Sequence, residues 1–209
     1  MHIPDGFLTT PIMALTWIIT LVVIAYAIKQ TKNKLTDAHI PLMGILAAFV
    51  FAAQMLNIPV AAGTSGHFLG GVLVAIFVGP WAGTIIMACV FIVQALIFQD
   101  GGILAMGANI FNMGIIGTLC GYYIYAALKK MAHNKILAAG VTSWLTVVLA
   151  SAFCSLELAA SGTSPLHMVL PAMVGVHTLI GIIEAAITIV VISTVLKSRP
   201  DLLSLEVPS

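Results

Sequence analysis

Residues 68–98 read FLGGVLVAIFVGPWAGTIIMACVFIVQALIF, and this stretch decides how many times the chain crosses a membrane. It is apolar throughout and long enough to form one extended helix. Gly79 and Pro80 interrupt it, and proline ends a helix and disfavours the helical conformation in the residue before it. We therefore expect two helices, Phe68–Val78 and Trp81–Phe98. The first is short, so other helices must bury it.

The composition places the whole chain in a membrane. Of 209 residues, 61% are hydrophobic and 7% are charged, whereas soluble domains contain roughly 25% charged residues. A hydrocarbon core needs about 20 apolar residues per helix. The other apolar runs are Leu8–Ile28, Ala38–Leu56, Gly107–Leu128, Ile136–Ser155 and Val169–Leu196. The prediction is an all-α integral membrane protein with seven transmembrane helices.

The basic residues support this span count and orient the chain. They are Lys29, Lys32, Lys34, Lys129, Lys130, Lys135, Lys197 and Arg199. With seven spans all of them fall on one face, which the positive-inside rule makes cytoplasmic. Six spans would place the middle three on the opposite face. We therefore expect the N-terminus outside and the C-terminus inside.

Nothing in the sequence divides the chain, so we expect a single domain, 1–209. It would begin with an extracellular ligand segment, 1–7, and end in a short cytoplasmic tail, 198–209. No G-x-x-x-x-G-K-[ST] nucleotide loop occurs, so ATP-driven transport would need an ATPase on another subunit. The three cysteines, Cys89, Cys120 and Cys154, fall inside spans and are expected to be buried apolar residues.

The first residues, MHIPDGFLTT, contain a possible metal chelate. They lack the basic start and the cleavage site of a secretory signal, so we expect the Met1 amine to be free. That amine, the backbone nitrogen of His2 and the Nδ1 of His2 can close two chelate rings around one ion. His67, in the segment GTSGHFLGG, can supply a fourth nitrogen from the same side of the membrane. Four coplanar nitrogens suit Ni(II) and Cu(II).

Polar residues at the outer ends of the spans are candidates to orient the two imidazoles by accepting a ring N–H. They are Asp5, Asn57, Ser65, Gln99 and Asp100. Each could equally be a turn or cap residue. Within the membrane, His177 and Glu184 form a pair on one helix face, and hydrogen bonds inside the bundle would explain it as well as a functional role.

A different function is also open. Residues 63–66, GTSG, match the G-x-S-G of rhomboid-like intramembrane serine proteases, and His177 could act as the base for Ser65. A Ser–His dyad requires the two side chains to lie within hydrogen-bond reach, which a sequence does not show.

The opening MHIPDG, together with SGHFLGG from Ser65 onward, resembles the CbiM/NikM family, the nickel- and cobalt-specific S components of energy-coupling-factor (ECF) transporters. The resemblance covers the whole chain. It implies a prokaryotic plasma-membrane protein, not an enzyme, with an S-component bundle and one extra N-terminal helix. It also implies capture of Ni(II) or Co(II) outside the cell through Met1, His2 and His67.

The same resemblance implies partners: a transmembrane coupling protein, a pair of ATP-binding-cassette ATPases that hydrolyse ATP, and in some systems a small accessory membrane subunit; it implies no nucleic acid. Gly44, Ala48 and Ala52 recur every four residues and would form a flat stripe for contact with the coupling protein. Internal packing is the alternative for this stripe. An S component for an organic vitamin, in which the N-terminal pair is incidental, is the alternative for the function.

Overall fold

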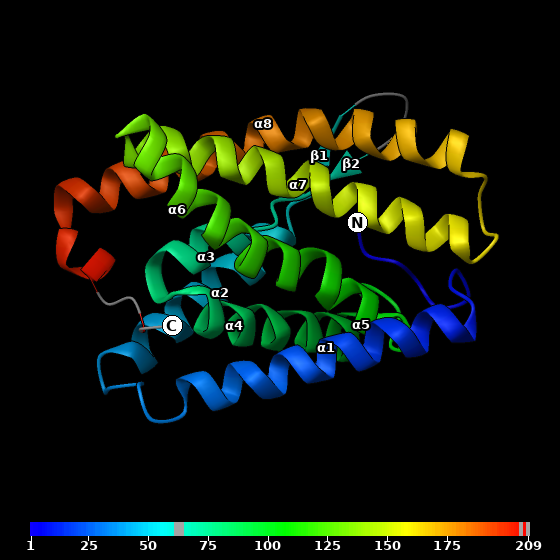
Figure 1. The fold of residues 1–209 in the computed structure, drawn as a ribbon, viewed down its shortest axis with the longest axis horizontal. Helices are drawn as coiled ribbons and strands as arrows, with labels where there is room; N and C mark the ends of the chain where they lie inside the picture. The colour runs from blue at the N-terminus through cyan, green and yellow to red at the C-terminus, as the bar shows by residue number, and fades with distance from the viewer. Residues whose placement is uncertain (61–64, 205–206, 208–209) are drawn as a thin grey trace.

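The computed structural model describes residues 1–60, 65–204 and 207 as a helical bundle (Figure 1). Its helices are α1 (Thr10–Thr31), α2 (His39–Gln54), α3 (Gly71–Val78), α4 (Pro80–Val93) with the π-helix η1 (Gln94–Phe98), α5 (Met106–Asn109) with the π-helix η2 (Ile110–Cys120) and α6 (Gly121–Ala132), α7 (Lys135–Ala160) and α8 (Leu166–Ser198). A 3-10 turn, η3 (Pro200–Ser204), follows α8. The continuous runs agree with the seven predicted spans.

The break predicted at residues 79 and 80 is confirmed. α3 ends at Val78, Gly79 has φ 82° and ψ 167°, and Pro80 is the first residue of α4. Glycine tolerates this positive φ without the strain that a Cβ would bring. The chain therefore turns sharply between the two helices, where one continuous helix would otherwise run.

The third helix is shorter than predicted. It begins at Gly71, and all eight of its residues are buried. Eight residues rise only about 12 Å, so α3 crosses part of the membrane and the neighbouring helices enclose it. Five of the other runs are long and apolar enough to span a membrane, and α2 is a shorter apolar helix of 16 residues.

Small residues let α3 sit at the centre of the bundle. A Cβ added to Gly71 would lie 2.8 Å from the Cα of Gly117 in η2, so the two backbones are in direct contact. In Figure 1, α7 and α8 run together along one edge of the molecule and α1 runs along the opposite edge, with α3, α4 and α5 between them.

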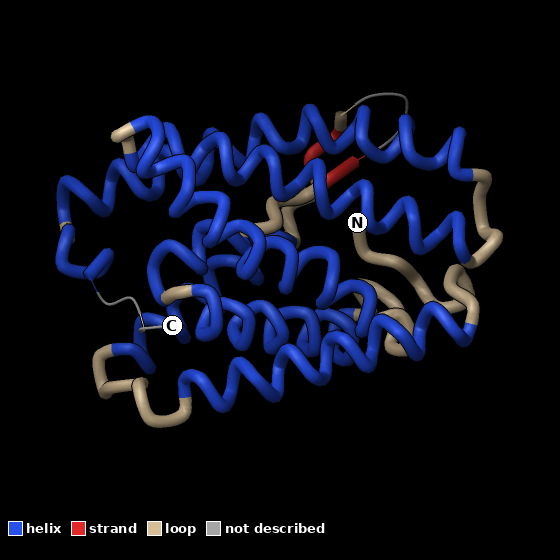
Figure 2. Tube along the Cα trace, viewed as in Figure 1, coloured by secondary structure: helices blue, strands red, loops and turns tan. Residues whose placement is uncertain are grey.

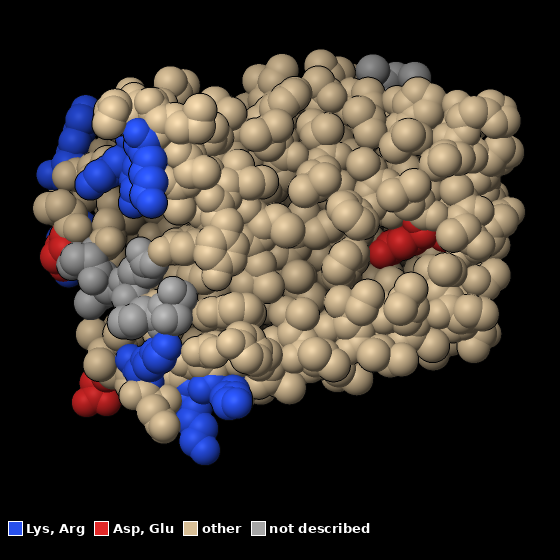
Figure 3. Space-filling view, viewed as in Figure 1, with Lys and Arg blue, Asp and Glu red and all other residues tan. Residues whose placement is uncertain are grey.

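The basic side chains visible in Figure 3 gather at one end of the molecule, and the rest of that face is almost free of charge. That end holds the last turns of α1, α6 and α8. The N–H of Val207 donates to the carbonyl of Val78, the last residue of α3, over 3.2 Å. The long axis of the bundle therefore has one strongly cationic end.

Two other segments enter the bundle without helical structure. Figure 2 shows the loop before α1 running back toward the middle of the molecule. The chain after α2 forms a two-residue antiparallel pair, β1 (Ile58–Pro59) with β2 (Ser65–Gly66), and then enters the core. Residues 66–70 are buried. These two segments carry His2 and His67.

Candidate metal site

The N-terminal segment is held in place by Asn109, at the end of α5. The Asn109 side chain accepts a hydrogen bond from the N–H of Ile3 over 2.7 Å and donates to the carbonyl of Ile3 over 3.0 Å. The N–H of Gly102 also donates to that carbonyl, over 2.9 Å. Two residues further on, Asp5 accepts from the backbone N–H groups of residues 103–105. This extended segment is therefore fixed without secondary structure of its own.

The loop that carries His67 is held by Glu184 of α8. The buried Glu184 carboxylate accepts the N–H of Leu69 over 2.6 Å and the N–H of Gly70 over 2.7 Å. From the other side, Gln54 Nε2 donates to the carbonyl of Leu69 over 2.7 Å. Glu184 thus has the structural role that the sequence left open, and it acts directly beside a predicted ligand.

His67 presents one nitrogen to the N-terminus. Its Nδ1 lies 2.8 Å from the carbonyl of Phe68. A carbonyl can only accept, so Nδ1 carries the proton and Nε2 keeps a free lone pair. The amine nitrogen of Met1 lies 3.5 Å from that Nε2. The structure therefore brings together two of the predicted donor atoms, 66 residues apart in the chain.

His2 lies against both partners, with its ring centroid 4.9 Å from that of His67. Its Nδ1 is 3.1 Å from the carbonyl oxygen of Asp100 and 3.5 Å from Asp100 Oδ1, while its Nε2 is buried without a hydrogen-bond partner. Gly101 permits this approach, because its φ is +96° and a Cβ there would come 3.2 Å from His2 Nδ1. In this arrangement Nδ1 of His2, which is the predicted ligand atom, is hydrogen-bonded to the carbonyl of Asp100.

Burial disfavours the charged form of all three groups. It lowers the pKa of the Met1 amine and lowers the pKa of His67 well below its ordinary value, and the nearby terminal charge lowers the latter further. Burial, with the same terminal charge, lowers the pKa of His2 to about 4. Burial therefore favours the neutral forms of the amine and of both imidazoles, whose lone pairs a metal ion requires.

The other predicted orienting residues have different positions. Asp100 contacts His2, as described, and Asp5 fixes the N-terminal segment without touching either ring. Asn57 and Gln99 are exposed. The backbone of Ser65 forms part of β2, and its side chain lies outside the described part of the structure. Asn109 and Gln54 were missed in the sequence, where single buried amides inside apolar runs were the available signal.

Within residues 1–60, 65–204 and 207, no three His, Cys, Asp or Glu side chains cluster in a way that could hold a metal ion. A metal site at the N-terminus therefore depends on main-chain nitrogens. The combination of a terminal amine, the amide of residue 2 and two imidazoles is the donor set that the geometry offers.

The family model described as "CbiM: Cobalt uptake substrate-specific transmembrane region" matches residues 2–202. The chain belongs to the CbiM family. Membership confirms the predicted resemblance and makes the chain a multi-pass prokaryotic membrane protein, the substrate-specific part of a metal uptake system. It favours transport over both the protease and the vitamin alternatives.

Individual relatives agree with this CbiM assignment. The chain is 43% identical over 206 residues to a putative fused nickel transport protein of Archaeoglobus fulgidus, covering 97% of this chain and 68% of the relative. It is 37% identical to a putative metal transport protein of Methanocaldococcus jannaschii, with 97% and 94% covered. A crystal structure of a truncated transition metal transporter superposes with a TM-score of 0.88 at 33% identity, covering 94% of this chain and 99% of that one.

The CbiM chain also carries the predicted small-residue stripe on α2. Gly44, Ala48 and Ala52 are all exposed, and a Cβ added to Gly44 would meet nothing within 4 Å. In the described structure these residues therefore do not pack inside the bundle, which was the alternative interpretation of the stripe.

Proposed function

We propose that the chain captures Ni(II) or Co(II) at the extracellular face and passes it inward as the S component of an ATP-driven ECF transporter. The observation that carries this proposal is the 3.5 Å approach of the Met1 amine to His67 Nε2, with the His2 ring beside them. Two segments that are distant in the sequence bring their nitrogens together, and buried polar side chains, Asn109 and Glu184, hold both segments in place.

The ligand set would be the Met1 amine, the backbone nitrogen and Nδ1 of His2, and Nε2 of His67. To ligate, the His2 ring turns about its Cβ–Cγ bond, so that Nδ1 leaves Asp100 and faces the amine. Metal binding also removes the proton of the His2 amide. A planar set of nitrogens favours Ni(II) over Zn(II), which prefers a tetrahedron.

The charge distribution supports the orientation. The cationic end of the bundle would face the cytoplasm by the positive-inside rule, and α1 then places the N-terminus at the exterior. The ion would enter from outside, where the binding segment 1–7 lies, and the tail 198–209 would lie inside.

The exposed stripe of Gly44, Ala48 and Ala52 would contact the transmembrane coupling protein, because small side chains let helices approach closely. The two ATP-binding-cassette ATPases would then supply the energy, since the chain itself has no nucleotide loop. A small accessory membrane subunit is a further possible partner.

The direct test is the nickel and cobalt content of the protein purified with its native N-terminus. We expect about one ion per chain, and its loss in His2→Ala and in His67→Ala. His167→Ala is the matched control, because His167 is exposed and lies outside the site. One residue added before Met1 should abolish binding by displacing the amine. Full metal content in this extended variant would contradict the proposal.

A further inference from the structure

A cavity of about 360 Å³ lies next to the candidate nickel site, between the N-terminal segment, α7 and α8. The proposed chelate uses the main chain of Met1 and leaves this cavity unexplained. The side chain of Met1 lines it, together with Cys154 of α7 and Met173 and His177 of α8. The remaining lining residues are Ile3, Pro4, Phe7, Leu158, Ala172, Val176 and His2.

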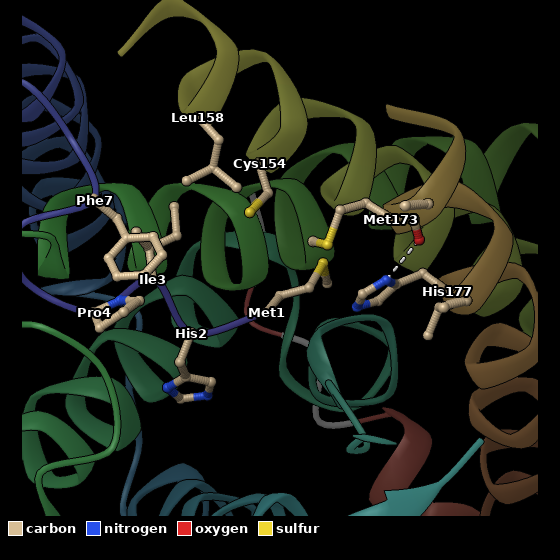
Figure 4. A pocket seen from close by; sticks show the side chains of 11 residues that line it. Met1, His2, Ile3, Pro4, Phe7, Cys154, Leu158, Met173 and His177 are labelled. Atoms are coloured by element: carbon tan, nitrogen blue, oxygen red, sulfur yellow. Dashed lines mark hydrogen bonds between the residues drawn. The ribbon is translucent and has the colours of Figure 1, made fainter. Parts of the chain in front are cut away.

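Four possible metal donors therefore face one space. Figure 4 shows the sulfur atoms of Met1, Cys154 and Met173 and the ring of His177 directed into the cavity. They come from three separate segments of the chain. Cys154 is buried, with 2% of its surface exposed. Cys154 is therefore one of four potential ligands in this cavity and not an isolated thiol.

His177 points to a ligand independently of the sulfur atoms. It is 6% exposed, and its Nδ1 lies 2.7 Å from the carbonyl of Met173. Nδ1 therefore carries the proton and Nε2 has the lone pair. Among the residues that the structure describes, that Nε2 has no hydrogen-bond partner, although its ring lines the cavity. The lone pair of this nitrogen is therefore available to a ligand in the cavity.

We propose that this cavity binds one soft monovalent cation of the Cu(I) and Ag(I) class. Thioethers and thiolates are soft ligands that select Cu(I), and imidazole is compatible with it. No carboxylate from the described part of the chain lines the cavity, so a hard divalent ion would find no oxygen anion among these residues. On binding, Cys154 gives its proton to solvent and forms a thiolate.

The charge balance favours a monovalent ion. A thiolate with a single positive charge makes a neutral pair, whereas a divalent ion would leave a net charge in an apolar cavity, which is costly. The soft site and the nickel chelate use different atoms of Met1, its thioether and its amine. Both sites can therefore be filled at once, and the inference stands apart from the proposed nickel function.

The experiment uses Ag(I) as the probe. The full chain, carrying Cys89→Ser and Cys120→Ser, is purified in detergent, so that Cys154 is the only thiol left of the three. Both replaced cysteines are exposed. Native mass spectrometry with excess Ni(II) should reveal a bound silver ion alongside nickel, and silver should protect Cys154 from alkylation by a maleimide.

Paired variants identify the site. Met173→Leu conserves volume and should weaken silver binding at least about tenfold. Met168→Leu, on the same helix but 60% exposed, should change nothing. His67→Ala should lose nickel and keep silver. Equal silver affinity in the two methionine variants would overturn the inference, as would one-for-one displacement of nickel by silver with Cys154 still open to alkylation.

Discussion

The protons released when nickel binds test the proposed chelate most directly. Burial lowers the pKa of the Met1 amine, of His67 and of His2, the last to about 4. Both imidazoles are then neutral near pH 7, and burial favours the neutral form of the amine as well, so these groups contribute little to the proton release. The His2 amide is the one proposed ligand group that must give a proton to solvent when it binds the ion. We therefore expect about one proton released per ion.

One released proton sets the slope of affinity against pH. Each unit of pH decrease should weaken nickel binding about tenfold, or about 1.4 kcal/mol. Nickel affinity falls as the pH falls because protons and the ion compete for the same nitrogens. The dependence should steepen near pH 4, where His2 also becomes protonated.

Isothermal titration calorimetry in buffers with different ionisation enthalpies measures the proton count. The variant with one residue added before Met1 is the control, since it should not bind nickel. A count near zero at pH 7 would exclude amide ligation. A count of about four would show that the amine and both imidazoles are charged before binding, contrary to the effect of their burial.

Three further predictions concern the surrounding residues. Asn109→Ala leaves the N–H of Ile3 unpaired, at about 1–3 kcal/mol, so nickel affinity measured by calorimetry should fall about tenfold or more. Asn134→Ala, which removes the cap of α7, should lower only the melting temperature. Glu184→Gln keeps one acceptor oxygen for two N–H groups, and should weaken nickel binding more than Glu157→Gln does; equal effects would mean that Glu184 only stabilises the bundle. Ala48→Trp should prevent co-purification with the coupling protein and leave nickel content unchanged, whereas loss of both would place Ala48 in the core.

The sequence contained enough information for the helices but only for part of the site. Span number followed from hydropathy, from Gly79 and Pro80, and from the positions of the basic residues, all of which are local features. His2 and His67 stood out because histidine and glycine are conspicuous outside the spans. The length of α3 was overestimated, since residues 68–70 are apolar and buried as a loop, and apolar character alone does not separate a buried loop from a helix.

The residues that hold the site were harder to find. Asn109 contacts Ile3 across 106 positions, and Glu184 contacts Leu69 across 115. Such pairings depend on how helices are arranged around each other, which no local pattern specifies. The position of the His2 ring depends likewise on Asp100, 98 residues away. The prediction that Cys89 and Cys120 are buried was wrong, because both are exposed on the described bundle. An apolar surface of a membrane protein contacts lipid, so hydropathy does not distinguish it from the core.

The short α3 determines how deep in the bundle the candidate metal site lies. Because this helix occupies only part of the membrane depth and begins four residues after His67, the buried imidazole lies inside the bundle rather than at its end. Under the proposed function, an ion bound to it would have lost part of its hydration shell and entered the protein before ATP is hydrolysed. Only the part of the bundle toward its cationic end would then separate that ion from the cytoplasm.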